Sequence, residues 1–199
     1  MKEFFSILAG LIALGGYIPY AVDIVKGRAQ PARSARFMFA FLLIVTILQQ
    51  TSLGSGWLIA FTAGELTGSI AILALAIKYG VGGLSKLDVA CYVLLLADIA
   101  LWLTTGNALL ALHFSVLADA IAFLPTIVKT WHEPQSETPI FFMSGIFAPV
   151  LNTLAVEKFT YGVLLFPLYL AFANLVETLL ILRRKGSRHG EKLPTEPVI

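Results

Sequence analysis

The chain has 199 residues, of which 58% are hydrophobic and only 13% charged, with a formal net charge of +2 at pH 7. Soluble globular domains carry about 25% charged residues, so this composition excludes a water-soluble globule and predicts an all-α integral membrane protein, multi-pass in the cell membrane. The single cysteine, Cys91, excludes an intramolecular disulfide.

Seven apolar runs predict transmembrane helices. A hydrocarbon core of about 30 Å is crossed by a helix of about 20 residues, and the runs that reach or approach this length lie at 4–25, 37–53, 57–77, 87–105, 107–129, 138–155 and 160–182. The first run is longer than the apolar part of a signal peptide and follows Lys2 and Glu3, so we interpret it as a spanning helix.

The basic residues predict the orientation of these spans, because cytoplasmic loops collect Lys and Arg. Seven spans place the first, third and fifth connections and the C-terminal tail on one side of the membrane. That side holds all of the 14 Lys and Arg residues except Lys2 and Lys158. The N-terminus is therefore predicted outside and the C-terminus in the cytoplasm, with residues 184–199 as a disordered tail.

The end of the first span and the end of the fifth share a pattern that predicts an internal repeat. PYAVDIVKGRAQP begins at Pro19, and PTIVKTWHEP begins at Pro125. When the sequence is aligned with itself without gaps, one alignment pairs Lys26 with Lys129 and Gln49 with Asn152. A second alignment pairs Glu65 with Asn174. We predict two parallel three-helix repeats, 1–80 and 107–183, joined by a linker helix within 81–106, in a 3+1+3 arrangement.

The repeated pattern resembles the PQ-loop motif of the SWEET and PQ-loop family. The motif comprises a proline, a lysine four residues later, a short charged loop and an aromatic-rich helix, here Pro125 to Lys129 and then Phe141 and Phe142. The resemblance covers nearly the whole chain by layout, but by sequence it rests on the two loop motifs and Asn174. It implies a transporter in which two three-helix bundles rock around a central site.

The resemblance also implies roles for individual residues. Asn174 matches an asparagine that binds the transported solute, whereas Glu65 stands where the family has another asparagine. A proline inside a helix removes a backbone hydrogen bond and permits a kink, so Pro19 and Pro125 are candidate hinges of an inner gate, or simply shape a fixed bundle. Pro139 is the candidate hinge of the sixth span; its counterpart on the second span is Arg36, so the set of prolines is incomplete.

Ionisable side chains inside a membrane are costly unless they pair or face a cavity, so they are candidate functional residues. Glu65 could accept hydrogen bonds from sugar hydroxyls, bind a cation or carry a proton, and Asp119 is a second candidate proton site. Asp98 and Asp119 do not lie in a Gly-x-Gly-Asp sequence, which disfavours an aspartyl protease. We expect His113 to be a packing residue.

Other polar and aromatic residues leave alternatives open. Gln49 and Asn152 either line an outer vestibule and contact substrate or join helices. A stacking face for a sugar is available from Phe39, Phe41, Phe142 or Phe147. The sequence contains no HExxH, CxxC or phosphate loop, so we expect no enzyme activity, no metal, no cofactor and no nucleic-acid partner.

The sequence thus predicts a SWEET-like facilitator of a small polar solute, with a sugar as the first candidate. One alternative is a proton-coupled transporter of an amino acid or vitamin, and another is a seven-helix receptor that binds ligand or cargo without transporting it. The expected partners are the small-molecule substrate and the lipid bilayer, and self-association into a homo-oligomer stays open.

Overall fold

The structure, a computed structural model, describes residues 1–29, 31, 33–80, 86–132, 134 and 137–183. These residues form seven α-helices and one short 3-10 helix, and no strand. The elements are α1 (Lys2–Val25), α2 (Arg33–Ser52), η1 (Gly56–Leu58), α3 (Ile59–Tyr79), α4 (Lys86–Thr105), α5 (Ala108–His132), α6 (Pro139–Thr153) and α7 (Tyr161–Arg183). Each predicted span thus corresponds to one α-helix, whereas the predicted tail lies outside the described residues.

Six of the helical segments described are long and apolar enough to cross a membrane: α1, α2, η1 together with α3, α4, α5 and α7. The α6 helix has 15 residues, which corresponds to about 22 Å at 1.5 Å per residue. Large apolar side chains face outward, including Leu103, Phe172 and Ile77, while polar residues such as Gln49 and Glu177 are buried. This distribution suits a multi-pass membrane protein, whose surroundings are apolar.

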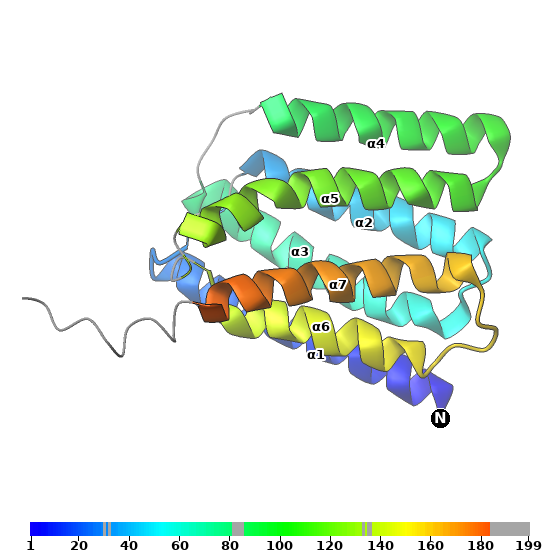
Figure 1. Ribbon diagram of the computed structural model, residues 1–199, viewed down its shortest axis with the longest axis horizontal. Helices are drawn as coiled ribbons and strands as arrows, with labels where there is room; N and C mark the ends of the chain where they lie inside the picture. Colours follow the sequence, from blue (N-terminus) through cyan, green and yellow to red (C-terminus); the bar gives the residue numbers. More distant parts are fainter. Residues whose placement is uncertain (30, 32, 81–85, 133, 135–136, 184–199) are drawn as a thin grey trace, which may run out of the picture.

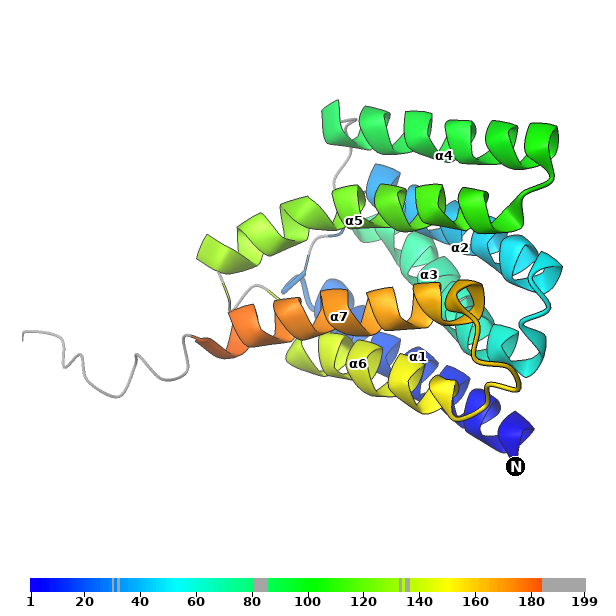
Figure 2. The same cartoon turned by 45° about the vertical axis from the view of Figure 1, so that its right-hand side comes forward.

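Six of the helices form a closed ring. Around it, each helix packs against the next in the order α1, α3, α2, α5, α7, α6, and α6 returns to α1. The remaining helix, α4, packs against the outer side of α5 and less extensively against α2. Figures 1 and 2 show the helices running roughly along one common direction, with α4 at the edge of the bundle.

The two ends of the bundle are distinguished by the chain ends. Met1 and the connections from α2 to η1, α4 to α5 and α6 to α7 lie at one end, which we call the Met1 end (Figure 1). The last residue of α7 lies at the opposite end, which we call the Arg183 end. At the Met1 end Gly54 and Gly106 turn the chain with φ of 71° and 64°, values that glycine adopts without steric cost.

Small residues bring α1 close to two neighbours. A Cβ on Gly64 of α3 would collide with the backbone of Gly10 on α1, and a Cβ on Gly16 of α1 would collide with Ser144 on α6. Such contacts between small residues allow helix backbones to approach closely in membranes, where packing is a main source of association. The position of α1 between α3 and α6 therefore depends on these glycines.

Candidate functional site

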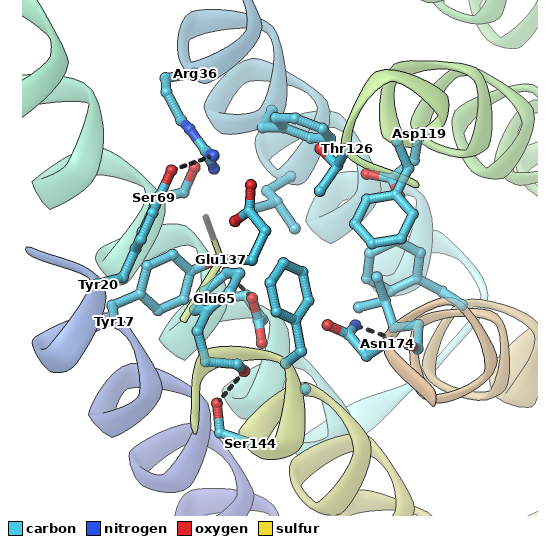
Figure 3. A pocket seen from close by; sticks show the side chains of 18 residues that line it. Tyr17, Tyr20, Arg36, Glu65, Ser69, Asp119, Thr126, Glu137, Ser144 and Asn174 are labelled. Atoms are coloured by element: carbon cyan, nitrogen blue, oxygen red, sulfur yellow. Dashed lines mark hydrogen bonds between the residues drawn. The ribbon is translucent and has the colours of Figure 1, made fainter. Parts of the chain in front are cut away.

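A cavity lies inside the ring of six helices (Figure 3). Its lining residues come from α1, α2, α3, α5, α6 and α7 and from Glu137, just before α6. The cavity contains about 860 Å³ of space free of atoms, counted out to its mouth. This volume includes space that opens to the surroundings, so the enclosed part is smaller, and the polar and aromatic lining is what marks the cavity as a candidate solute site.

Three of the residues predicted from the sequence meet in this cavity. Glu65 on α3, Asp119 on α5 and Asn174 on α7 all line it. Asp119 and Asn174 lie near the middle of their helices, and Glu65 lies in the first half of α3. Figure 3 shows Asp119 and Asn174 on one side of the cavity and Glu65 on another. The structure therefore brings both candidate proton sites and the candidate substrate-binding asparagine to one cavity.

Each of the two carboxyl groups receives a hydrogen bond from a tyrosine. The Tyr17 hydroxyl on α1 donates to Glu65 Oε2 at 2.7 Å, and the Tyr169 hydroxyl on α7 donates to Asp119 Oδ2 at 2.6 Å. Neither carboxyl group belongs to either of the salt bridges found among the described residues. The cavity thus contains two acidic groups that are oriented by hydroxyls and have no basic partner in the described chain.

The Asn174 amide is hydrogen-bonded to its own helix and lies against a glycine, Gly145, of the neighbouring helix. Its Nδ2 donates to the Leu170 carbonyl oxygen at 2.8 Å. A Cβ on Gly145 of α6 would collide with the Asn174 amide. Gly145 therefore provides the space in which this amide lies against the cavity, where an amide can both donate and accept hydrogen bonds.

Arg36 on α2 is the most important lining residue whose position the sequence analysis missed. Its Nη2 donates to the Tyr20 hydroxyl at 2.7 Å, and its guanidinium carbon lies 5.0 Å from the centre of the Tyr20 ring and 5.8 Å from that of Phe39. Its Nε is buried and has no hydrogen-bond partner within the described part of the chain. The sequence identified Arg36 only as a missing proline, yet a basic residue next to a long apolar run was a usable signal.

Aromatic side chains form much of the remaining wall. The Phe141 ring centre lies 4.9 Å from that of Tyr17, 5.2 Å from that of Tyr20 and 5.0 Å from that of Phe142. Of the candidate stacking residues, Phe39 and Phe142 line the cavity. Phe41 and Phe147 do not belong to the lining; they are 38% and 61% exposed on the outer surface.

Gln49 and Asn152, the other two candidate substrate-binding residues, lie outside the cavity lining. Gln49 Nε2 donates to Asp98 Oδ1 at 2.8 Å, and the Ser115 hydroxyl lies 2.5 Å from Asp98 Oδ2 and 3.0 Å from Gln49 Oε1. Asn152 Nδ2 donates to the Leu58 carbonyl oxygen at 3.2 Å. Both amides thus join helices, because their helices turn them toward α4, α5 and η1 rather than toward the cavity.

The other polar candidates also make contacts between helices. The His113 ring nitrogens lie 2.7 Å from the Leu109 carbonyl oxygen and 2.8 Å from the Tyr161 hydroxyl. Glu177 on α7, which was not among the residues predicted from the sequence, is fully buried and accepts a hydrogen bond from Thr130 on α5. The other carboxyl oxygen of Glu177 has no partner among the described residues. Neither His113 nor Glu177 belongs to the cavity lining.

The candidate hinge prolines occupy different positions in their helices. Pro19 lies inside α1 and Pro125 inside α5, and each is flanked by cavity-lining residues. Pro139 is instead the first residue of α6, where a proline removes no helical hydrogen bond, so the basis for a kink at this position is absent. Two prolines that the sequence analysis passed over, Pro149 and Pro167, are buried inside α6 and α7.

The bundle is packed tightly between the cavity and the Met1 end. The Ser6 hydroxyl of α1 donates to the Trp57 carbonyl oxygen, and the Thr62 hydroxyl of α3 donates to Gln50 Oε1 of α2 at 2.8 Å. A small apolar cluster completes this layer, formed by Leu58, Val156 and Val163. In the opposite direction the cavity lining continues to Arg36, in the first turn of α2, and to Glu137, just before α6, both of which lie near the Arg183 end.

The described residues contain no group of three or more His, Cys, Asp or Glu side chains placed to hold a metal ion. No protein-family model matches the sequence, and neither a curated protein nor a solved structure is similar enough to count as a match. The residues that line the cavity are therefore the main evidence for a function.

Proposed function

We propose that all seven α-helices cross the membrane as two parallel three-helix units and a linker, with the N-terminus outside and the C-terminus in the cytoplasm. The helix neighbours support this arrangement. The third helix of each unit lies between the other two, as α1, α3, α2 and as α5, α7, α6. The contact between α1 and α6 corresponds to that between α5 and α2, and α4 stays outside the ring.

The short α6 helix fits this arrangement when the residues after it are included. Leu154 continues the turn, and Ala155 and Val156 are buried at the Met1 end. These residues extend the apolar segment toward the predicted span 138–155 without extending the helix. Non-helical backbone is tolerated at membrane depth where protein surrounds it.

Within this arrangement the chain is a SWEET-like facilitator, which moves a small polar solute down its gradient by alternating access. The observation that carries the proposal is the polar cavity: it lies near the helix midpoints, both three-helix units line it, and packed residues separate it from the Met1 end. Transporters of this kind bind their substrate near the bilayer midplane between repeats. Rocking of one unit against the other would expose the cavity to each side in turn.

A sugar is the solute that the family resemblance favours. Glu65 and Asp119 can accept hydrogen bonds from hydroxyl groups, Asn174 can donate and accept them, and Phe39 and Phe142 offer apolar faces. Because these groups form hydrogen bonds and offer apolar contact, they suit a small polar molecule.

Transport is tested by flux into liposomes that contain the purified protein, using sugars, amino acids and vitamins. We expect flux of one class, reduced at least about tenfold by Asn174→Ala and unchanged by Glu157→Gln, since Glu157 is exposed outside the cavity. Ligand binding without flux would identify a receptor instead of a transporter. Flux that Asn174→Ala leaves intact would remove this cavity from the transport path.

Proton coupling is the second candidate, and two carboxyl groups without a basic partner in one cavity favour it. It predicts flux that rises when a pH gradient is imposed and loses this dependence in Glu65→Gln or Asp119→Asn. Equal flux with and without the gradient, in the native protein and both variants, would leave the facilitator as the only candidate of the two.

A further inference from the structure

Among the described residues the cavity lining holds one basic side chain, Arg36, and three acidic ones, of which Glu137 lies with Arg36 nearer the Arg183 end. The other two, Glu65 and Asp119, form the acidic part of the cavity, and Arg36 forms its basic part. Glu137 is already paired with Lys129 at 2.9 Å. Within the described chain, Arg36 and the carboxyl groups of Glu65 and Asp119 form no salt bridge with each other or with any other residue.

Two tyrosines of α1 each contact one of these parts. Tyr17 donates to Glu65, and the Tyr20 hydroxyl accepts from Arg36. These tyrosines are three residues apart on α1, which corresponds to a rise of about 4.5 Å along the helix axis. The two tyrosines thus contact groups of opposite charge from neighbouring positions on α1, Glu65 through Tyr17 and Arg36 through Tyr20.

We propose that the cavity takes a zwitterionic solute of the α-amino acid class, with its ammonium group toward Glu65 and Asp119 and its carboxylate toward Arg36. The Arg36 guanidinium lines the cavity and has five N–H donors, of which one donates to the Tyr20 hydroxyl. The proposal rests on the cavity being the solute site of the proposed transporter, and it names the substrate class of that site.

Charge compensation favours a zwitterion over the other small polar solutes. Unpaired ionisable groups are costly inside a membrane, and a neutral sugar would leave both the acidic and the basic part uncompensated. A simple amine would compensate only the carboxyl groups, and a simple carboxylate only Arg36. A zwitterion places an ammonium group beside the acidic part and a carboxylate beside Arg36, while the aromatic wall around Phe141 and Phe142 offers an apolar surface to its side chain.

The first test compares ligands that differ by one charged group. Thermal unfolding of the full purified chain is measured with each standard amino acid, and with leucine, isoamylamine (leucine without its carboxylate), isocaproate (leucine without its ammonium group) and a panel of sugars. We expect a stabilising shift with one or more amino acids, and a smaller or no shift with a compound that lacks either charge. A shift with sugars alone, or with no amino acid, would overturn the proposal.

The second test assigns each charge to its residue. Arg36→Gln should weaken binding of the amino acid at least about tenfold, as loss of a charge-assisted hydrogen bond does, while leaving the affinity for the matching amine unchanged. Arg36→Lys should restore part of the loss. Glu65→Gln and Asp119→Asn should weaken the amino acid and the amine alike. The matched controls are Lys26→Gln and Glu157→Gln, which remove exposed charges outside the cavity.

If the variants do not fold, the ligand series measured on the native protein decides the question. An equal loss of amino acid and amine binding in a folded Arg36→Gln protein would contradict the assigned orientation. Flux separates this proposal from the transport proposal: an amino acid that binds but is not moved contradicts transport alone, whereas sugar flux without amino acid binding contradicts the zwitterion alone.

Discussion

Gly145 influences the cavity because it has no side chain. Its Cα faces the Asn174 amide so closely that a methyl group at this position would collide with it. The amide must then rotate or α6 must move away from α7. Either change alters the hydrogen-bonding face that Asn174 presents to a solute, although neither residue carries a charge.

We therefore predict that Gly145→Ala weakens solute binding about tenfold or more while the protein still folds. Alanine favours helix over glycine by about 1 kcal/mol, which offsets part of the strain. The control is Gly15→Ala in α1, where a Cβ meets nothing within 4 Å, and this variant should bind as the native protein does. Ligand-induced thermal shifts measure both, and equal binding by Gly145→Ala would show that the amide does not contact the solute.

Single residues also show what the sequence alone could and could not reveal. Glu65, Asp119 and Asn174 were identified because an ionisable or amide side chain inside an apolar run is rare and costly. Tyr17 and Tyr20 gave no such signal, since tyrosine is common in membrane helices. Their role depends on which face of α1 points inward, and both the inward and the lipid-facing sides of that helix are apolar.

At the scale of elements, the crossing of α1 and α3 depends on two glycines. A Cβ on Gly64 would collide with the Gly10 backbone, which cannot move aside as a flexible side chain could. Buried against these glycines are further small and aromatic residues, Ala9, Ala13 and Phe61. The two helices therefore approach as closely as their backbones allow.

Gly64→Ala should accordingly lower the free energy of unfolding by about 1–3 kcal/mol, the usual cost of overpacking. Thermal or denaturant unfolding in detergent provides the measurement, again with Gly15→Ala as the control. Unchanged or increased stability of Gly64→Ala would mean that α1 and α3 can separate at little cost.

The attachment of α4 depends on a buried polar cluster, Gln49, Asp98 and Ser115, contributed by α2, α4 and α5. Ser115→Ala removes a hydroxyl that contacts both other members. Because buried polar groups that lose a partner are costly, we expect a loss of stability of about 1–3 kcal/mol. The control is Thr67→Ala, because the exposed Thr67 hydroxyl donates to a carbonyl oxygen of its own helix. An equal loss of stability in both variants would show that the cluster contributes no more than an exposed hydroxyl does.

The helices themselves were easier to predict than their contacts. An apolar run of a given length specifies a helix, because every backbone group in lipid must be hydrogen-bonded within the segment. The register of the repeat suggested equivalent sites for Gln49 and Asn152, and the structure turns both toward helix contacts. The rotation of a helix about its axis is set by its neighbours, which a single apolar sequence does not encode visibly.

At the scale of the whole molecule, the distribution of basic residues predicts which end of the bundle faces the cytoplasm. A tag after residue 199 should be inaccessible to impermeant reagents in intact cells. A cysteine replacing Glu157, at the Met1 end, should react from outside, whereas one replacing Lys78, near the Arg183 end, should react only after the cells are opened. The native thiol of Cys91 is buried and contributes little background. The reverse pattern would invert the topology.

The ring has two seams between the three-helix units, and they differ in extent. The seam between α1 and α6 is broad: it contains the contact of Gly16 with Ser144, a hydrogen bond of 2.6 Å from Thr138 to Asp23, and the rings around Phe141. The seam between α2 and α5 is narrower. In the proposed transporter, the two units would separate first along the narrower seam between α2 and α5, with α1 and α6 as the hinge.

The polar cluster of Gln49, Asp98 and Ser115 joins α2, α4 and α5 across the narrower seam. Gln49 and Ser115 lie in the halves of α2 and α5 nearer the Met1 end, and Asp98 bridges them across the narrow seam. Nearer the Arg183 end, a hydrogen bond of 2.8 Å from the Tyr92 hydroxyl to the Ser34 carbonyl oxygen joins α4 to α2. In the proposed transporter, opening at the Met1 end would therefore require the polar cluster to rearrange, so α4, which lies outside the ring, would influence how readily that end opens.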